Sequence, residues 1–450
     1  MNVNRISKIV CGKSMAASLA LLFLPCAALC DDGTQTTAKA KATSKVPALT
    51  AKKTSGAASA TKNSGPTTVS HQTGKPRLVA EPTKGASATL HDPKRGMDIH
   101  RSLSGSRRVE VERPDHSRIV AEGKGRGYVQ TPYTYHGHEY ARRLYYYNGR
   151  HHQAYYGRYA YHGVWLNPYY PAYYYPSAYY SWVSYPWGAP ASYAWGWNAN
   201  PWFAYYGGFF TPLAVYPSAS LWLTDYILAT SLADAYQGQA AALTNPAALT
   251  PEVKQLIAAG VREQLTLEFN ESQTAPNNGE PDAGSSSIQR LLTDGKQHAF
   301  ITGHDLDVVD AAGTECALTE GDVILLTGQT APDAQAATLT VLASKGGNEC
   351  GKGDIVSVGL ADLQEMQNHL RETIDQGLQE LRTKQGQGGL PAAPAAAKAA
   401  PVESPMAEIA PPPPPESEVA AQIAQQSQEA DQAEKEATAN VAAAPRPNAP

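Results

Sequence analysis

Tyrosine and tryptophan are missing from most of this sequence. All 25 Tyr and all 7 Trp of its 450 residues lie within 128–236. A chain with several globular domains distributes aromatic residues among their cores, because these side chains contribute much of the buried area. The three domains that the length alone would allow are therefore not expected. We predict instead a mostly disordered or low-complexity chain with one small α+β domain.

Long apolar runs are also lacking, with one exception near the N-terminus. Residues 15–24 form an apolar run that follows Arg5, Lys8 and Lys13 and is too short to span a bilayer. This order of features is typical of a cleavable secretion signal, which we place at 1–30. We expect an exported protein, in the periplasm, at the cell surface or outside the cell, with no transmembrane segment after signal cleavage.

Cysteine is scarce, and three of the five cysteines belong to the leader or its edge: Cys11, Cys26 and Cys30. Cleavage after Ala28 or after Cys30 would place small side chains where signal peptidase needs them. The alternative is a lipid anchor on Cys26 or Cys30.

Only two cysteines are secure in the mature chain, Cys316 and Cys350. An even pair in an exported protein is typical of a disulfide. Closing a loop of about 35 residues would stabilise the fold by roughly 3–4 kcal/mol. A zinc site needs three or four ligands, and no further His or Cys lies close enough in sequence to complete one. We therefore predict a Cys316–Cys350 disulfide.

Charge is segregated although the formal net charge is only −4. Residues 31–127 carry 18 Lys and Arg against 9 Asp and Glu, whereas 237–450 carry 12 against 29. A basic arm and an acidic C-terminal half can attract each other, or opposite partners, within a Debye length. The simpler interpretation, which we favour here, is a solvated tail.

The composition changes along the chain in a way that predicts its layout. Few apolar residues precede residue 128, and closely spaced prolines after it should exclude helices and deprive a sheet of hydrogen-bond donors. The predicted segments are a disordered basic region (31–127), a Tyr/Trp/Gly/Pro-rich low-complexity region (128–217), a helical connector (218–270), a linker (271–287), a small β-rich domain with a C-terminal helix (288–384) and a disordered Ala/Pro/Gln/Glu tail (385–450).

The segment 288–384 has the pattern of a globular domain. Five apolar runs bounded by turn residues predict strands: HAFIT, LDVVDA, GDVILLTG, ATLTVLAS and DIVSVGL. A helix is predicted over 361–384, and another begins where Thr250 precedes Pro251 as an N-cap. We expect an SH3-like barrel or a rolled antiparallel sheet with a C-terminal helix.

Motifs of common catalytic sites are absent: the sequence has no Gly-x-Ser-x-Gly, His-Glu-x-x-His or phosphate-binding glycine loop. We interpret the histidines of the tyrosine region as polar spacers rather than zinc or copper ligands: His136, His138, His151, His152 and His162. We interpret His304, Asp305 and Asp307 as the start of a strand. The sequence thus predicts a protein that is not an enzyme and holds no metal or other cofactor.

The tyrosine region is the most informative feature for function. Its rings could stack on sugar faces or on each other, and we name as possible contact residues Tyr169, Tyr174, Tyr180, Trp182, Trp187, Trp195, Trp197 and Trp202. Export argues against nucleic acid. We predict a structural or adhesive protein whose multivalent aromatic contacts engage envelope polysaccharide or other copies. The alternative is a peptide- or glycan-binding β domain with the aromatic region as its tether.

Three segments and the Tyr/Trp-rich middle resemble a group of uncharacterised exported bacterial proteins that carry a small C-terminal β domain. The segments are LTPEVKQLIAAGV, ECALTEGDVILLTG and SVGLADLQEMQNHLRETIDQGL. The resemblance covers roughly 160–385. It implies the same layout and no known activity, cofactor or catalytic residue.

Overall fold

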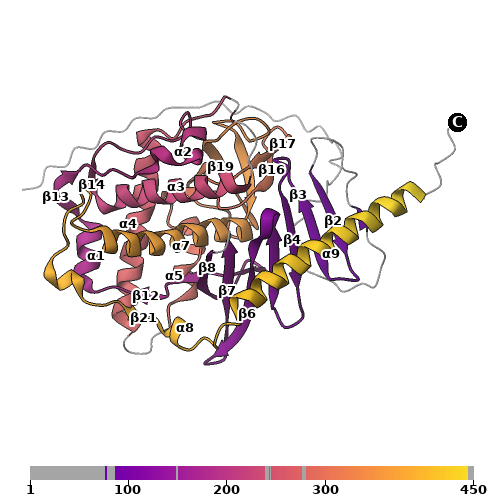
Figure 1. The fold of residues 1–450 in the computed structure, drawn as a ribbon, viewed down its shortest axis with the longest axis horizontal. Coiled ribbons are helices and arrows are strands. Elements are labelled where there is room, and N and C mark those ends of the chain that lie inside the picture. Colours follow the sequence, from indigo (N-terminus) through magenta and orange to yellow (C-terminus); the bar gives the residue numbers. More distant parts are fainter. Residues whose placement is uncertain are drawn as a thin grey trace, which may run out of the picture. The chain divides into compact units, whose positions relative to one another are not determined.

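Residues 87–170 contribute eight of the nine strands of an antiparallel sheet in the computed structural model (Figure 1). The structure describes residues 77–78, 87–147, 150–238, 243, 245–275 and 280–443. In sheet order the strands are β1 (Arg77–Leu78), β2 (Ala88–Asp92), β3 (Met97–Arg101), β4 (Arg107–Glu112), β5 (Arg118–Glu122), β6 (Arg126–Tyr135), β7 (His138–Tyr147), β8 (Arg150–Gly157) and β11 (Tyr169–Tyr170). Neighbours from β1 to β8 are consecutive in sequence, so this part of the sheet is a meander.

The prediction of a mostly disordered chain with one small domain is therefore wrong. Strands β2 to β5 lie inside the region predicted as disordered, and their buried positions carry medium-sized side chains such as Leu90, Met97 and Ile99 between charged neighbours. That alternation has a period of two, which the average composition hides. In β6 to β8, tyrosines and arginines occupy buried positions, where the apolar pattern of a strand is not recognisable.

The predicted signal peptide at 1–30, with Cys11, Cys26 and Cys30, lies outside the described residues. None of the helices that the structure describes combines the length and the apolar character needed to cross a bilayer.

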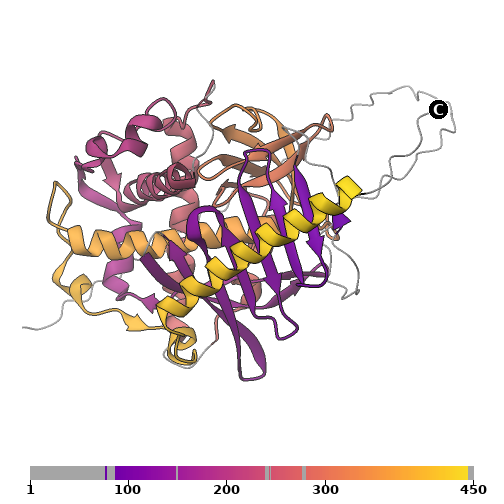
Figure 2. The ribbon, with the colours of Figure 1, turned by 45° about the vertical axis from the view of Figure 1, so that its right-hand side comes forward.

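A C-terminal helix, α9 (Glu416–Ala443), lies across the face of this sheet (Figure 2). Its buried side chains Val419 and Ile423, with three alanines further along, pack on the apolar face formed by β2 to β6. Small side chains allow the helix to approach the strands closely. The tail prediction fails here because alanine and glutamine favour a helix that is only marginal alone, whereas the sheet supplies the missing apolar partner.

Ion pairs also join α9 to the sheet. Arg101 Nε donates to Glu434 Oε1 over 2.7 Å, and Arg95 Nη2 donates to Glu436 Oε1 over 2.9 Å. Arg107 reaches Asp431 as well. The basic and acidic parts of the chain thus attract each other, and the favoured interpretation of the basic arm as a solvated tail is wrong for 95–107.

The second sheet has six antiparallel strands in the order β15-β18-β19-β20-β16-β17. They are β15 (Gln297–Ile301), β16 (Leu306–Asp310), β17 (Glu315–Leu318), β18 (Val323–Thr327), β19 (Ala336–Ala343) and β20 (Ile355–Gly359). Five of them coincide with the predicted apolar runs, and β17 was missed. The predicted disulfide is confirmed, because Cys316 in β17 is bonded to Cys350 with their Cα atoms 4.9 Å apart.

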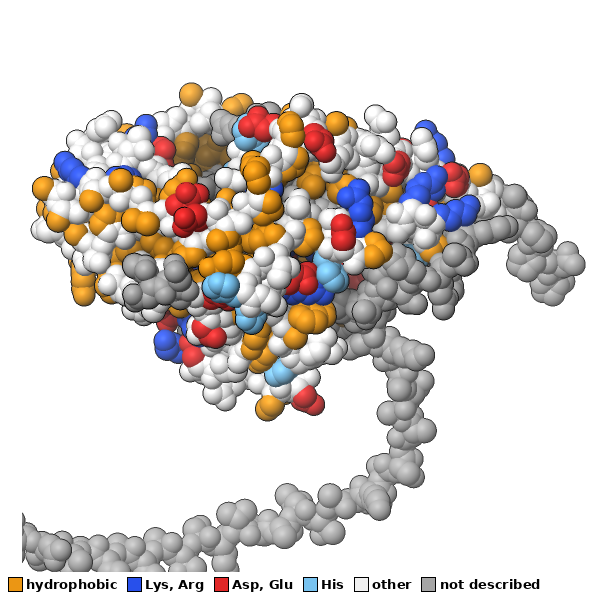
Figure 3. Space-filling model, turned by 90° about the horizontal axis from the view of Figure 1, so that it is seen from below, with side chains coloured by type: hydrophobic (Ala, Val, Ile, Leu, Met, Phe, Trp, Pro, Cys, Tyr) orange, Lys and Arg blue, Asp and Glu red, His pale blue; other side chains and the backbone are white. Residues whose placement is uncertain are grey.

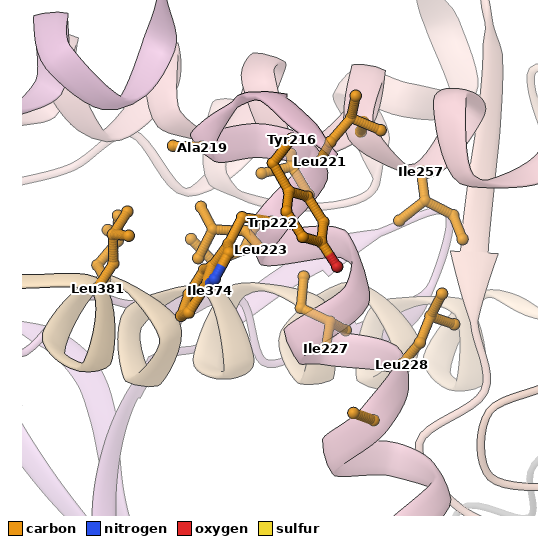
Figure 4. Close-up of a cluster of buried hydrophobic side chains, with 14 of the residues drawn as sticks. Tyr216, Ala219, Leu221, Trp222, Leu223, Ile227, Leu228, Ile257, Ile374 and Leu381 are labelled. Atoms are coloured by element: carbon orange, nitrogen blue, oxygen red, sulfur yellow. The ribbon is translucent and has the colours of Figure 1, made fainter. Parts of the chain in front are cut away.

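Three long helices pack the tyrosine region against this second sheet: α3 (Ala219–Gly238), α4 (Pro251–Thr274) and α7 (Leu360–Lys384). Thr250 is the N-cap of α4, and its hydroxyl accepts from the Val253 amide. Figure 4 shows Trp222 and Ile227 of α3 beside Ile374 of α7. One core therefore contains side chains from segments that the sequence placed in separate regions.

Two short helices stand between the prolines that were expected to exclude them. Helix α1 (Ser177–Ser184) begins after Pro176, and α2 (Pro201–Tyr205) begins with Pro201 itself. Proline is tolerated at the first turn of a helix, where its missing N–H has no intrahelical partner to lose. The remaining short elements are β9 (Tyr159–Tyr161), β10 (Val164–Leu166), β12 (Tyr173–Tyr174), β13 (Pro186–Ala191), β14 (Tyr216–Ser218), α5 (Ala283–Ser286), α6 (Gln289–Thr293), β21 (Val402–Glu403) and α8 (Pro405–Glu408).

Candidate functional site

Most of the aromatic residues singled out from the sequence are core residues. The buried ones are Tyr169, Tyr174, Tyr180, Trp187 and Trp202. The others, Trp182, Trp195 and Trp197, are partly buried and pack against the same core. On the face drawn in Figure 3, charged and histidine side chains form small separate groups among apolar and aromatic ones. Burial leaves these eight rings little surface to offer a multivalent ligand.

One of these buried residues, Tyr169, also lines a cavity of about 100 Å³ that is partly open to solvent. The cavity lies beside α7, between β8, β11 and β12. Its walls combine tyrosine rings, amides, an imidazole and two carboxyl groups: His152, Gln153, Ala154, Tyr169, Ala172, Tyr173, Tyr175, Glu372, Asp375, Gln376 and Gln379. The carboxyl groups of Glu372 and Asp375 come from one turn of α7, since residues three apart share a helix face.

Tyrosine hydroxyls hold the Glu372 carboxylate in place. Tyr156 donates to its Oε1 atom, and the Tyr145 hydroxyl lies 3.5 Å from the same atom. The two hydroxyls are themselves 2.8 Å apart. His152 brings Nε2 to 3.8 Å from Glu372 Oε2. The carboxylate is therefore fixed in one orientation at the cavity wall.

Asp375 has one satisfied and one unsatisfied oxygen. Tyr169 donates its hydroxyl to Oδ2 over 2.5 Å. Oδ1 is buried and has no hydrogen-bond partner among the described residues. Burial raises the pKa of this carboxyl to about 7, because desolvation disfavours the charged form. A buried polar atom without a partner is costly, so a rotation of this carboxyl that brought Oδ1 to the cavity wall would let a ligand hydroxyl satisfy it.

More acidic groups lie behind Asp375 and make the region electronegative. Glu268 of α4 is buried, and burial raises its pKa well above the usual range. The guanidinium of Arg371 pairs with Glu271 over 3.5 Å and is the buried cation of this group. The single positive charge of Arg371 cannot balance all the neighbouring carboxyl groups, so protonation of some of these carboxyls is favoured.

Replacing Asp375 by asparagine is expected to make stability less dependent on pH between about 4 and 7. In the unfolded chain this carboxyl ionises near 3.8, whereas in the folded protein it keeps its proton until about pH 7. The stability tied to its protonated form is complete below the lower value and is lost as pH rises through the higher one. Asparagine cannot ionise. As pH rises from about 4 to 7, urea unfolding should therefore show that the free energy of unfolding of wild type falls relative to that of D375N. A difference between the two proteins that does not change with pH would contradict this prediction.

The predicted histidine and acidic candidates do not converge on one site. His152 lines the cavity and stacks on Tyr145, with ring centroids 4.6 Å apart. His136 contacts Glu280, and His151 contacts Glu416. His162 lies near the Ala334 carbonyl. His138 begins β7 and is exposed.

The segment around His304 begins a strand, as predicted, because β16 starts at Leu306. Burial lowers the pKa of His304 to about 4. Asp305 accepts a hydrogen bond from Ser104, and Asp307 accepts from the Leu103 amide over 3.0 Å. These side chains thus join the second sheet to the loop after β3.

Elsewhere in the described chain, one group of possible metal ligands has atoms within 4.8 Å of one another: Glu263, Asp294 and His298. Lys296 Nζ lies 3.0 Å from Glu263 Oε1 and 3.8 Å from Asp294 Oδ2. A lysine ammonium thus already balances these carboxylates, and the contacts are those of an ion-pair network.

Comparison with known proteins adds no relative, since no protein-family model, curated protein or solved structure matches this chain. The resemblance to uncharacterised exported proteins stays a prediction.

Sequence reasoning missed Glu372 and Asp375. The signal available was their spacing of three in the predicted helix 361–384, followed by Gln376 and Gln379 on the same side. A helix with a polar stripe beside its apolar one ordinarily turns that stripe to water. Here the polar stripe instead borders a cavity, because Tyr169 and Tyr173, about 200 residues earlier in the chain, pack beside it. The spacing of residues within the helix carries no information on that long-range contact.

Proposed function

We propose that this is an exported, non-enzymatic protein that binds a sugar unit of an envelope polysaccharide in the cavity beside α7. The observation that carries the proposal is the Asp375 carboxyl, which lines a cavity walled mainly by tyrosine rings, amides and a second carboxyl and whose Oδ1 atom has no hydrogen-bond partner among the described residues. The export rests on the leader sequence. The proposal retains the predicted ligand class and moves the contact from exposed rings to one cavity.

The wall chemistry suits a polyhydroxyl ligand. Carboxylate oxygens accept hydrogen bonds from hydroxyl groups, and glutamine amides both donate and accept. Tyr173 is 40% exposed and offers a ring face at the cavity mouth, where the apolar face of a sugar can pack. A cavity of about 100 Å³ accommodates part of one sugar unit, so the rest of a polymer would lie in solvent. The two carboxyls disfavour phosphate, which agrees with the expectation of no nucleic acid.

Replacing Tyr173 by alanine is expected to weaken binding of the mature protein to purified peptidoglycan or lipopolysaccharide roughly 5- to 100-fold, as expected for a lost stacking ring. Binding would be measured by co-sedimentation over a range of polymer concentrations. Tyr173 is partly exposed, so its removal should leave the fold intact.

Tyr185 provides the matched control, since it is 68% exposed and does not line the cavity. The Tyr185→Ala variant should bind like wild type. Equal weakening by both variants would favour a diffuse aromatic surface over the cavity. The proposed non-enzymatic glycan binding would be contradicted if the wild-type protein bound neither polymer. Release of shortened sugar products by the wild-type protein would contradict it as well.

A further inference from the structure

A second group of buried charges lies at the ends of strands of the second sheet, beside the disulfide. Lys345 follows β19, Asp322 precedes β18, and Glu349 is the neighbour of Cys350. Their side chains are 2%, 0% and 9% exposed, respectively. Burying one lysine with two carboxyls is expensive unless the three are closely arranged.

Their arrangement places an amine against a polarised carboxyl. Lys345 Nζ contacts Asp322 Oδ1 directly, and Glu349 Oε1 lies 3.6 Å from the same nitrogen. The Thr319 amide donates to Asp322 Oδ2 over 2.7 Å. The Phe209 ring lies over the amine, with its centroid 5.3 Å from Nζ. The group is therefore dry, and each polar atom has a defined neighbour.

We propose that Lys345 and Asp322 join in an intramolecular amide bond, with Glu349 as the proton relay. The lone pair of Lys345 Nζ attacks Cγ of the protonated Asp322 carboxyl, and the C–N bond forms. Glu349 takes a proton from the attacking nitrogen and delivers it to the departing Asp322 hydroxyl, so that the C–O bond breaks and one water leaves. The step is a condensation and needs no oxidant or other reactant.

The surroundings supply the electrostatic help that this step requires. The Thr319 N–H points at Asp322 Oδ2, the oxygen on which negative charge grows in the tetrahedral intermediate. Burial raises the pKa of Asp322 to about 7, so its protonated, electrophilic form is populated at neutral pH. The two carboxyls hold the pKa of Lys345 above its usual value, which opposes loss of its proton to solvent. Proton transfer from Lys345 to Asp322 within the pair gives the neutral amine without changing the charge of the group.

The chain contains a matched pair that lacks the relay. Lys254 Nζ lies 2.6 Å from Asp225 Oδ1, and both side chains are as buried as those of the first pair. Asp225 Oδ2 accepts from the Leu213 amide and from the Tyr216 hydroxyl, each over 2.6 Å. No second carboxylate contacts Lys254 among the described residues. This pair should therefore remain an ion pair.

Mass spectrometry of the full mature chain tests the proposal. After reduction of the disulfide and cleavage with a protease that cuts after leucine, because trypsin has no site between Lys296 and Lys345, wild type should give a branched peptide that joins the segments containing Lys345 and Asp322 and is lighter by one water than the two separate peptides. The Lys254 and Asp225 segments should appear as separate linear peptides. Separate linear peptides for Lys345 and Asp322 in wild type would overturn the proposal, as would a branch at Lys254.

Variants test the role of each residue. Lys345→Arg removes the nucleophile and should give only linear peptides. Glu349→Gln keeps the shape of the relay without its basicity and should reduce the branched fraction at least tenfold. A fully branched Glu349→Gln protein would overturn the relay assignment. The wild-type measurement decides the bond itself, whatever the folding yield of the variants.

Discussion

Replacing Asp225 by asparagine is expected to lower the free energy of unfolding by about 3–5 kcal/mol, the range for removing one partner of a buried ion pair. Asp225 and Lys254 are fully buried, 2.6 Å apart, and no other carboxylate contacts the ammonium in the described chain. The asparagine amide can still accept from Leu213 and Tyr216. The loss therefore measures the uncompensated charge of Lys254, and urea unfolding at pH 7 would quantify it.

The double variant Asp225→Asn/Lys254→Met is the control. Methionine fills much of the volume of lysine and carries no charge, so the double variant should recover at least half of the lost free energy. A single variant within about 1 kcal/mol of wild type would contradict the burial of this pair. A double variant no more stable than the single one would show that lost packing, and not charge, causes the effect.

Replacing Trp222 by alanine is expected to cost a similar amount, about 3–5 kcal/mol. Trp222 is fully buried in α3, as Figure 4 shows. Its ring stacks on Trp195 with centroids 4.6 Å apart and meets Tyr193 edge-on at 5.7 Å. Removing it leaves a large cavity among rings that cannot collapse without breaking these contacts. Chemical denaturation followed by far-ultraviolet circular dichroism would give the change without relying on tryptophan emission.

Trp165 provides the comparison within the same aromatic segment. It is 56% exposed, and its ring lies under the Arg158 guanidinium at 4.4 Å. Trp165→Ala should change the free energy of unfolding by at most about 1 kcal/mol, the size of an exposed cation–π contact. Equal and small effects at Trp165 and Trp222 would mean that the tyrosine region has no fixed core.

Local rules predicted most of the elements between residues 250 and 384. The start of α4 follows from Thr250 and Pro251, and five of the six strands of the second sheet follow from apolar runs between turn residues. The disulfide follows from the two cysteines, Cys316 and Cys350, that lie outside the predicted leader and its edge. Each of these features depends on residues that are close in sequence or, for the disulfide, on two cysteines for which only one pairing is possible.

The N-terminal sheet and the docking of α9 could not be predicted in the same way. Tyrosines in these strands do not produce a recognisable alternation of apolar and polar residues, because each has both an apolar ring and a polar hydroxyl. The ring is buried, and the hydroxyl donates to a carboxyl group such as that of Glu372 or Asp375. Helix α9 is polar by composition, and its stability comes from the sheet face and from arginines more than 300 residues away. The cavity combines both difficulties, since its walls come from the tyrosine region and from α7.

Amide hydrogen exchange of the mature protein, with and without solubilised peptidoglycan fragments, tests the central claim most directly. Three segments that are distant in sequence contribute residues to the cavity wall: 152–154, 172–175 and 372–379. We predict that the fragments slow exchange in all three segments together and leave exchange in the strands of the second sheet unchanged. Slowed exchange confined to 297–359, or no change in any segment at saturating fragment, would contradict it.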